Sequence, residues 1–291
     1  MAYLQIAHFI IRIVMLILLK ILPKRLMSAI TGFLTNVPFP KWFLKGFLKM
    51  FVKVLKVNME EAVYPISHYR TVNDFFTRPI KQSQRPIDSN PDTIVSPVDG
   101  RVIEKGDIVN DKALQIKGMP YSITELIKHE DFSRKFLNGH FITLYLSPKD
   151  YHRIHLPYNG TGIATEYNRG ALFPVNNLGL HNIQNLFAIN ERLTTFFETS
   201  FGLGALVKVA AVNVGKIKTT YQQPWTHKEM KQKRSIFASL DSISYAKGDE
   251  LARFELGSTV ILLFEKDSIT FVDGLGSGRF LKMGETFAHI K

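Results

Sequence analysis

Four side chains of this sequence have the types that nucleophilic chemistry needs. They are Ser258 in LGST, Asp99 in SPVDG, and His152 and His155 in DYHRIHLP. A serine hydroxyl becomes a nucleophile when an imidazole takes its proton and a carboxylate fixes the tautomer of that imidazole. The chain order Asp, His, Ser neither supports nor excludes such a set, because triads are defined by geometry. These residues therefore predict a histidine-activated serine.

Each motif also has a plain structural interpretation. Asp and Gly favour turns for local reasons, so VDG is first of all a turn. Two histidines three residues apart could form half of a metal site, but no third ligand is evident and the chain has no cysteine. The G-x-S-x-G elbow, the P-loop and the dinucleotide glycine fingerprint are absent from the sequence. We expect no metal.

The serine lies in RFELGSTVILLF (253–264), which reads as a core strand with an interruption. VILLF (260–264) has the composition of a strand covered on both faces. Glycine inside a strand usually marks a bulge or a close approach of another group to the backbone. We therefore expect Gly257 and Ser258 to form a bulge within one buried strand.

The elements around these motifs predict an α+β fold, predominantly antiparallel β with peripheral helices. Strands are expected in residues 93–106, 140–167, 205–221 and 251–264, with an Asn-Gly hairpin signal at 159–160. Helical patterns cover residues 122–137 and 182–197. The 291 residues suffice for one large domain or two ordinary ones.

The positive charge is concentrated at the N-terminus. The net charge is +12, and residues 1–59 carry nine Lys or Arg and no Asp or Glu. The cations lie among Phe, Leu, Ile and Met, whereas a nucleic-acid-binding arm would be polar. No nucleic-acid partner is expected. The lack of cysteine fits a reducing compartment.

The segment KWFLKGFLKMFVKVLKV (41–57) predicts a helix lying at a membrane surface. Its lysines recur every fourth residue and share one face, while aromatic and aliphatic residues fill the rest. The segment 6–22 is apolar but contains Arg12 and Lys20, which are costly inside hydrocarbon. A secretory signal peptide is not expected, since no small-residue cleavage site follows. Packed soluble helices and a spanning helix stay as alternatives.

Taken together, the motifs resemble a known family. FELGST, SPVDGRV, YHRIHLP, GALFPVN (170–176), NDFFTRPIKQSQRPID (73–88) and KGDELARF (247–254) occur in the order and approximate spacing of the phosphatidylserine decarboxylases. The resemblance covers roughly residues 60–290. The basic, apolar N-terminus is similar to the membrane-associating helices of the bacterial members.

This resemblance implies a self-processing enzyme. The Ser258 hydroxyl attacks the carbonyl of Gly257, and β-elimination then cuts the chain into residues 1–257 and 258–291. The new N-terminus becomes a pyruvoyl group, the covalent cofactor and Schiff-base site. The resemblance also implies that His155, oriented by Asp99, is the base that activates Ser258 for the cleavage. Glycine leaves its own carbonyl unobstructed for this attack.

The resemblance assigns two further residues. His152 is the proton donor of decarboxylation, and its ordinary pKa of about 6.5 suits proton transfer near neutrality. Phe173 packs near the head group or the glycerol of the substrate. The implied organisation is a membrane-associating region, residues 1–60, and a catalytic domain, residues 61–291.

The expected function is conversion of phosphatidylserine to phosphatidylethanolamine and CO₂ by a peripheral enzyme on the cytoplasmic face of a bacterial inner membrane. Anionic lipids and the two chains of one precursor are its expected partners, and a homodimer is one alternative for its assembly. The main rival is a membrane-associated serine hydrolase that uses Ser258, His155 and Asp99 without self-cleavage. A non-enzymatic membrane scaffold and a decarboxylase of soluble amino acids are weaker alternatives, the latter because it leaves the lysine-aromatic helices unexplained.

Overall fold

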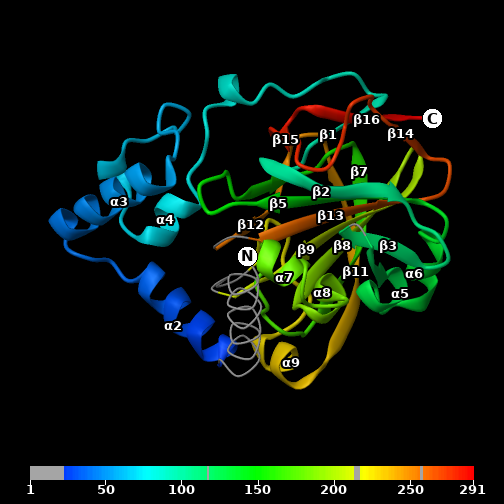
Figure 1. The fold of residues 1–291 in the computed structure, drawn as a ribbon, viewed down its shortest axis with the longest axis horizontal. Helices are drawn as coiled ribbons and strands as arrows, with labels where there is room; N and C mark the ends of the chain where they lie inside the picture. Colours follow the sequence, from blue (N-terminus) through cyan, green and yellow to red (C-terminus); the bar gives the residue numbers. More distant parts are fainter. Residues whose placement is uncertain (1–22, 117, 213–216, 256–257) are drawn as a thin grey trace, which may run out of the picture.

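The computed structural model describes residues 23–116, 118–212, 217–255 and 258–291, and its largest element is an eight-stranded sheet (Figure 1). The strand order is β11-β7-β8-β9-β13-β5-β2-β15, and all the pairs in it are antiparallel. The α+β prediction is confirmed. The strands are β2 (Gly100–Asp107), β5 (His140–Leu146), β7 (Gly160–Asn168), β8 (Arg192–Thr199), β9 (Gly202–Val209), β11 (Ser235–Tyr245), β13 (Ser258–Phe264) and β15 (Phe280–Leu281).

Strand β13 lies inside this sheet, between β5 and β9. Its VILLF residues are all 0 % exposed, as the composition predicts for a strand covered on both faces. The strand's backbone is paired along both edges, so Ser258 at its beginning is attached to the most deeply buried part of the protein.

Smaller antiparallel sheets pack around this one. They are β10-β12-β6, formed by β10 (Ile217–Thr219), β12 (Glu250–Phe254) and β6 (Arg153–His155); β1-β16-β14, formed by β1 (Thr93–Val95), β16 (Thr286–Ile290) and β14 (Ile269–Phe271); and the hairpin of β3 (Lys112–Ile116) and β4 (Met119–Ser122).

The prediction of one strand over residues 251–264 is wrong, because β12 and β13 belong to different sheets. The strand in the small β10-β12-β6 sheet ends at Phe254, and the strand in the large sheet begins at Ser258. The bulge expected at Gly257 lies outside the described residues. The predicted Asn-Gly hairpin is also wrong. The strand β6 pairs with β12 and not with β7, and the Asn159 side chain instead accepts a hydrogen bond from Lys247 N at 2.8 Å.

The helices of the β-rich body are short: α5 (Ile123–Leu126), α6 (Glu130–Lys135), α7 (Asn177–Leu180), α8 (Leu186–Ile189) and α9 (His227–Gln232), with a 3₁₀ turn η2 (Gln82–Gln84). The helix predicted over 122–137 is interrupted, because the chain turns extended at Ile127 and Lys128 N donates to the Glu166 carboxylate. The helix predicted over 182–197 is wrong beyond Ile189. The segment RLTTFFET forms β8, where β-branched and aromatic side chains pack on a sheet.

The N-terminal helices lie to one side of the body (Figure 1). They are α2 (Lys24–Asn36), α3 (Lys41–Leu55) and α4 (Val72–Phe76), with the 3₁₀ turn η1 (Ile66–His68). Their own apolar cluster consists of Leu44, Leu48, Val57, Tyr69 and Phe75. Residues on both sides of the predicted boundary at residue 60 therefore share this cluster, and the boundary itself stays a prediction.

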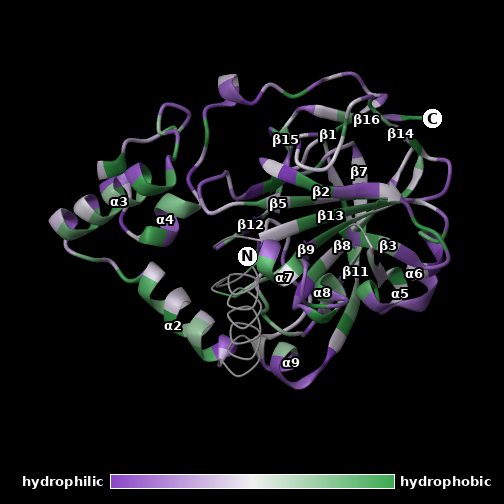
Figure 2. Cartoon of the chain, viewed as in Figure 1, coloured by the Kyte–Doolittle hydropathy of each residue, from purple (hydrophilic) through white to green (hydrophobic). Residues whose placement is uncertain are grey.

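Hydrophilic and hydrophobic residues alternate along these helices (Figure 2). The lysines of α3 are all exposed: Lys41, Lys45, Lys49 and Lys53. Large exposed apolar side chains accompany them, including Phe33 on α2, which is 70 % exposed, and Trp42 on α3, which is 77 % exposed. No helix in the described residues is long and apolar enough to cross a bilayer. Residues 6–22, with Arg12 and Lys20, lie outside the described part.

Candidate active site

Ser258, the candidate nucleophile, is wholly buried and its hydroxyl has no hydrogen-bond partner among the described residues. It is the first residue of β13, opposite Leu146 at the end of β5. A buried hydroxyl without a partner costs free energy, so such a group marks a site where function and stability conflict. Gly257, the predicted acyl donor, lies outside the described residues.

His152 lies close to the same corner of the sheet, because the turn Ser147–Asp150 connects its segment to Leu146, the last residue of β5. The imidazole is wholly buried against the ring of Phe76, with 4.0 Å between ring centroids. The ring Nδ1 donates to the Asp150 carbonyl at 2.8 Å, and Nε2 has no partner among the described residues. His152 thus presents an unoccupied lone pair at Nε2 inside the protein.

The protonation state expected for His152 needs correction. Burial lowers its pKa to about 3, since a low-dielectric environment disfavours the imidazolium. His152 is therefore neutral at pH 7 in this state, and it cannot donate a proton from Nε2 before it gains one. An anionic substrate group beside the ring would raise this pKa and favour the charged form.

His155, on β6, has hydrogen bonds at both ring nitrogens. Its Nδ1 donates to the Gly248 carbonyl at 2.7 Å, and its Nε2 accepts from the Tyr151 hydroxyl at 2.9 Å. Burial lowers the pKa of His155 as well, so the ring is neutral and can act as a base. The tautomer is fixed by the backbone of residue 248.

Asp99 is buried in the turn before β2, where it contacts a cation and not a histidine. Arg85 donates to both carboxylate oxygens, at 2.8 and 2.5 Å, and Met283 N donates to one of them at 2.8 Å. The turn lies next to β6, because His155 N donates to the Pro97 carbonyl at 2.8 Å. Asp99 therefore makes no direct hydrogen bond to His155 in this structure, and the predicted orientation of the imidazole by this carboxylate is not a direct contact.

Phe173 lies at the same end of the large sheet. The Asn190 amide donates to the carbonyls of Phe173 and Ala210, at 2.9 and 3.0 Å. Ala210 follows Val209, which pairs with Thr259, so this amide ties the Phe173 loop to the entry of β13. Helix α2 reaches the same loop, since Lys24 lies over the Phe173 ring at 4.6 Å.

The structure thus gathers the predicted residues around one corner, where β5 ends and β13 begins. Sequence reasoning missed three contacts of this corner: Arg85, Tyr151 and Gly248. Each lies within a motif that we quoted, but nothing in a motif shows which side chain fills which hydrogen bond. Among the described residues, no cluster of three or more His, Asp and Glu side chains could hold a metal ion.

Fold and site together define an α+β protein with a candidate active site, in which the buried hydroxyl of Ser258 begins a core strand and two neutral imidazoles lie on nearby segments. The family model described as phosphatidylserine decarboxylase matches residues 72–289. The chain belongs to this family.

Curated relatives are similar over nearly their whole length. A phosphatidylserine decarboxylase proenzyme of Myxococcus xanthus is 40 % identical over 268 residues, covering 92 % of this chain and 95 % of the relative. The proenzyme of Brevibacillus brevis is 42 % identical over 270 residues, covering 92 % and 94 %. That of Saccharophagus degradans is 38 % identical over 274 residues, covering 94 % and 96 %. The serine hydrolase alternative finds no support among them.

Proposed function

We propose that this chain is a self-processing proenzyme that converts phosphatidylserine to phosphatidylethanolamine and CO₂ at a membrane surface. The reaction follows from family membership, and it makes the enzyme a carboxy-lyase. The observation that supports the self-processing is the buried hydroxyl of Ser258 at the beginning of β13, which has no hydrogen-bond partner among the described residues.

The residues present fit a pyruvoyl group made from Ser258. The Ser258 oxygen leaves with the Gly257 carboxylate in the β-elimination, so it needs no lasting hydrogen-bond partner, and it has none among the described residues. The pyruvoyl carbonyl, once formed, supplies an electron sink for the breaking carbon–carbon bond. The residues that surround it are the neutral imidazoles and the Phe173 loop.

His155 is proposed as the base of the cleavage. Its Nδ1–H is held by the Gly248 carbonyl, so its lone pair is on Nε2. Tyr151 must release Nε2 before that nitrogen takes the Ser258 proton. The Ser258 oxygen then attacks the Gly257 carbonyl, and the acyl group moves from nitrogen to oxygen. The buried Asp99–Arg85 pair fixes the turn whose Pro97 carbonyl holds the backbone of His155.

His152 is proposed as the group that moves the proton of decarboxylation. Its unoccupied Nε2 is free to accept a proton, and the carboxylate of the bound substrate stabilises the resulting imidazolium. The ring then holds that proton beside the reacting carbon. The Phe173 loop, tied to Ala210 by Asn190, is proposed to border the head group.

The N-terminal helices are proposed to hold the enzyme on anionic lipid, with residues 1–60 as the membrane-associating region and 61–291 as the catalytic domain. The exposed lysines of α3 and the exposed apolar residues beside them support this role. A bacterial inner membrane, approached from the cytoplasmic face, fits the cysteine-free sequence and the bacterial relatives.

The test is a denaturing gel combined with a CO₂-release assay. Wild-type protein should show chains of residues 1–257 and 258–291, and it should release CO₂ from phosphatidylserine. The Ser258→Ala variant should give one full-length, folded, inactive chain. Borohydride should trap substrate on the small chain of the wild type. An intact wild-type chain that still decarboxylates phosphatidylserine would refute self-processing.

A further inference from the structure

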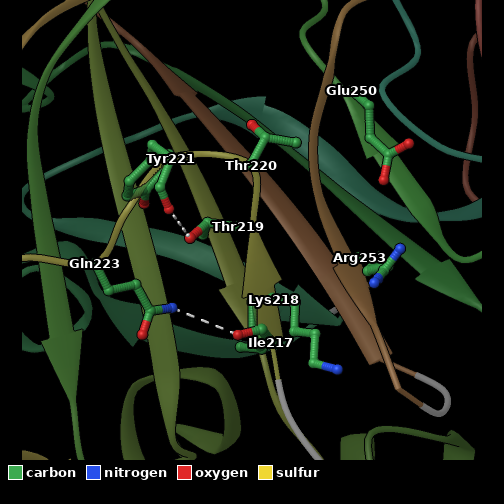
Figure 3. A pocket seen from close by; sticks show the side chains of 8 residues that line it. All are labelled: Ile217, Lys218, Thr219, Thr220, Tyr221, Gln223, Glu250 and Arg253. Carbon is green, nitrogen blue, oxygen red and sulfur yellow. Dashed lines mark hydrogen bonds between the residues drawn. The ribbon is translucent and has the colours of Figure 1, made fainter. Parts of the chain in front are cut away.

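A charged cleft of about 550 Å³ lies on the small β10-β12-β6 sheet, outside the corner described above (Figure 3). Lys218 on β10 and Arg253 on β12 line it, together with Glu250. Arg253 is the fourth of the five residues of β12, and Ser258 is five residues further along the chain, so the two are at most about 17 Å apart. An occupant of the cleft is therefore near the reacting end of the enzyme.

Three cations form a row across the small sheet. Arg253 is directly opposite Lys218 on one side and directly opposite Arg153 on the other. Side chains of directly opposite residues share one face of a sheet, and like charges placed so are destabilising. The row therefore needs negative charge, from the protein or from a ligand.

Among the described residues, ion pairs reach only the outer two cations. Glu255 pairs with Lys218 at 2.6 Å, and Glu250 pairs with Arg153 at 2.7 Å. Arg253, between them, has no hydrogen bond or ion pair with the described residues, and it is only half-buried in the cleft. The middle guanidinium is left for an anion.

This face of the small sheet also carries a candidate catalytic residue. His155 is two residues after Arg153 on β6, so the two side chains point to the same face. A molecule whose anionic group is bound by Arg253 would thus reach both His155 and the beginning of β13. Among the groups of phosphatidylserine, the phosphodiester is the anion that remains throughout the reaction.

We propose that this cleft is the phosphodiester subsite, in which Arg253, with Lys218 beside it, holds the phosphate of the phosphatidylserine head group. This inference rests on the proposed function. It adds the contact by which the enzyme would prefer a phospholipid to free serine. The planar guanidinium matches two phosphate oxygens at once. Free serine lacks this phosphate and cannot use the contact.

The binding test uses the uncleaved Ser258→Ala chain and glycerophosphoglycerol, which has the phosphodiester but no amine to react. In a phosphorus NMR titration, the Arg253→Gln change should weaken binding by about 10- to 100-fold, the usual range for a lost charge-assisted hydrogen bond. Arg253→Lys should retain part of the affinity. The matched control is Arg134→Gln, which removes an equal charge from the exposed surface of α6 and should leave the affinity unchanged.

Two results would overturn the proposal. Equal affinity of the Arg253→Gln and parent chains would show that Arg253 does not hold the diester. Tighter binding of inorganic phosphate than of glycerophosphoglycerol would identify a site for free phosphate and reject the lipid head group. Both readouts use an uncleaved chain, so neither depends on whether the wild type processes itself.

Kinetics on the mature enzyme provide the second arm. Arg253→Gln should raise the KM for phosphatidylserine in nonionic micelles by about 10- to 100-fold, with a much smaller change in kcat. Self-cleavage, which involves no lipid, should still run to completion on a gel. A wild type that fails to cleave would count against the proposed function alone, whereas an unchanged KM in a cleaved variant would count against the subsite alone.

Discussion

At the scale of single residues, the two histidines differ in what their Nε2 atoms contact. The Nε2 of His155 accepts from Tyr151, whereas the Nε2 of His152 has no partner among the described residues. Both rings are neutral because burial lowers their pKa values. Two neutral bases at one corner suit the two proposed proton transfers, one in maturation and one in turnover.

The first prediction separates these transfers. His155→Ala should arrest self-cleavage, because the Ser258 hydroxyl loses its base. His152→Ala should mature but turn over about 10²- to 10⁴-fold more slowly, the usual contribution of general acid–base catalysis. A gel reports maturation, CO₂ release reports turnover, and His289→Ala, at an exposed position of β16, is the control. If His152→Ala fails to cleave while His155→Ala cleaves normally, the two roles are reversed.

The second prediction concerns Lys208, which is wholly buried on β9. Its ammonium nitrogen bonds to Thr195 Oγ1 at 2.8 Å and to the Leu206 carbonyl at 3.2 Å, and burial lowers its pKa to about 7. An unfolded lysine has a pKa of about 10.4, so between pH 7 and 10 the unfolded chain binds more protons than the folded one. Folding stability should therefore increase with pH across this window.

Denaturant unfolding of the Ser258→Ala chain should show this increase, by roughly 2 kcal/mol from pH 7 to pH 9. Adding Lys208→Met should flatten the profile, because the titrating group is gone and the methionine fills similar space. An equally steep profile in the Lys208→Met chain would show that another group titrates.

At the scale of elements, local patterns predicted what each segment contributes but not which sheet receives it. VILLF specified a buried strand because five consecutive large apolar residues leave no face for water. The LGST step was assigned to a bulge, since a sequence does not show that β12 and β13 pair with different partners. The RLTTFF segment was assigned to a helix, although sheet packing favours its β-branched and aromatic residues.

The same limit applies to the candidate site. Ser258, His152, His155 and Asp99 were identified from residue types and motifs, and the structure places them around one corner. The partners of Asp99 and His155 were not identified, because Arg85 and Gly248 lie 14 and 93 residues away from them and meet them through tertiary packing. Hydrogen bonds between such segments depend on register and topology, which periodicity does not encode.

The third prediction tests helix α3 as a lipid contact. Its lysine row should be changed to glutamate at all positions: Lys41, Lys45, Lys49 and Lys53. Each lysine near an anionic surface is worth about 1 kcal/mol, so flotation with anionic vesicles should fall sharply while self-cleavage continues. The control reverses an equal number of exposed lysines elsewhere: Lys112, Lys135, Lys231 and Lys266. Unchanged flotation of the α3 variant at low salt would reject the row as a lipid contact.

At the scale of the whole molecule, the proposed cut divides the chain without dividing the fold. Residues 258–291 supply β13 to the large sheet, β14 and β16 to a second sheet, and β15 to the edge beside β2. The larger chain supplies all the strands that pair with β13. The two chains therefore share one hydrophobic core, and neither the large sheet nor the β1-β16-β14 sheet is complete without strands from both chains.

The last prediction follows from this division. Residues 260–264 are all 0 % exposed, and burying each such side chain contributes about 1.5–3 kcal/mol, so this strand alone contributes roughly 10 kcal/mol to retention of the small chain. The backbone pairs begin at Ser258 with β5 and at Thr259 with β9, and they do not depend on the bond before Ser258. Native mass spectrometry of the mature enzyme should show both chains in one particle at micromolar concentration, and only denaturant should separate them. The uncleaved Ser258→Ala chain is the control, because it shows the mass expected without a cut. Dissociation of the two chains on simple dilution to that concentration would mean that cleavage loosens β13 from its neighbours.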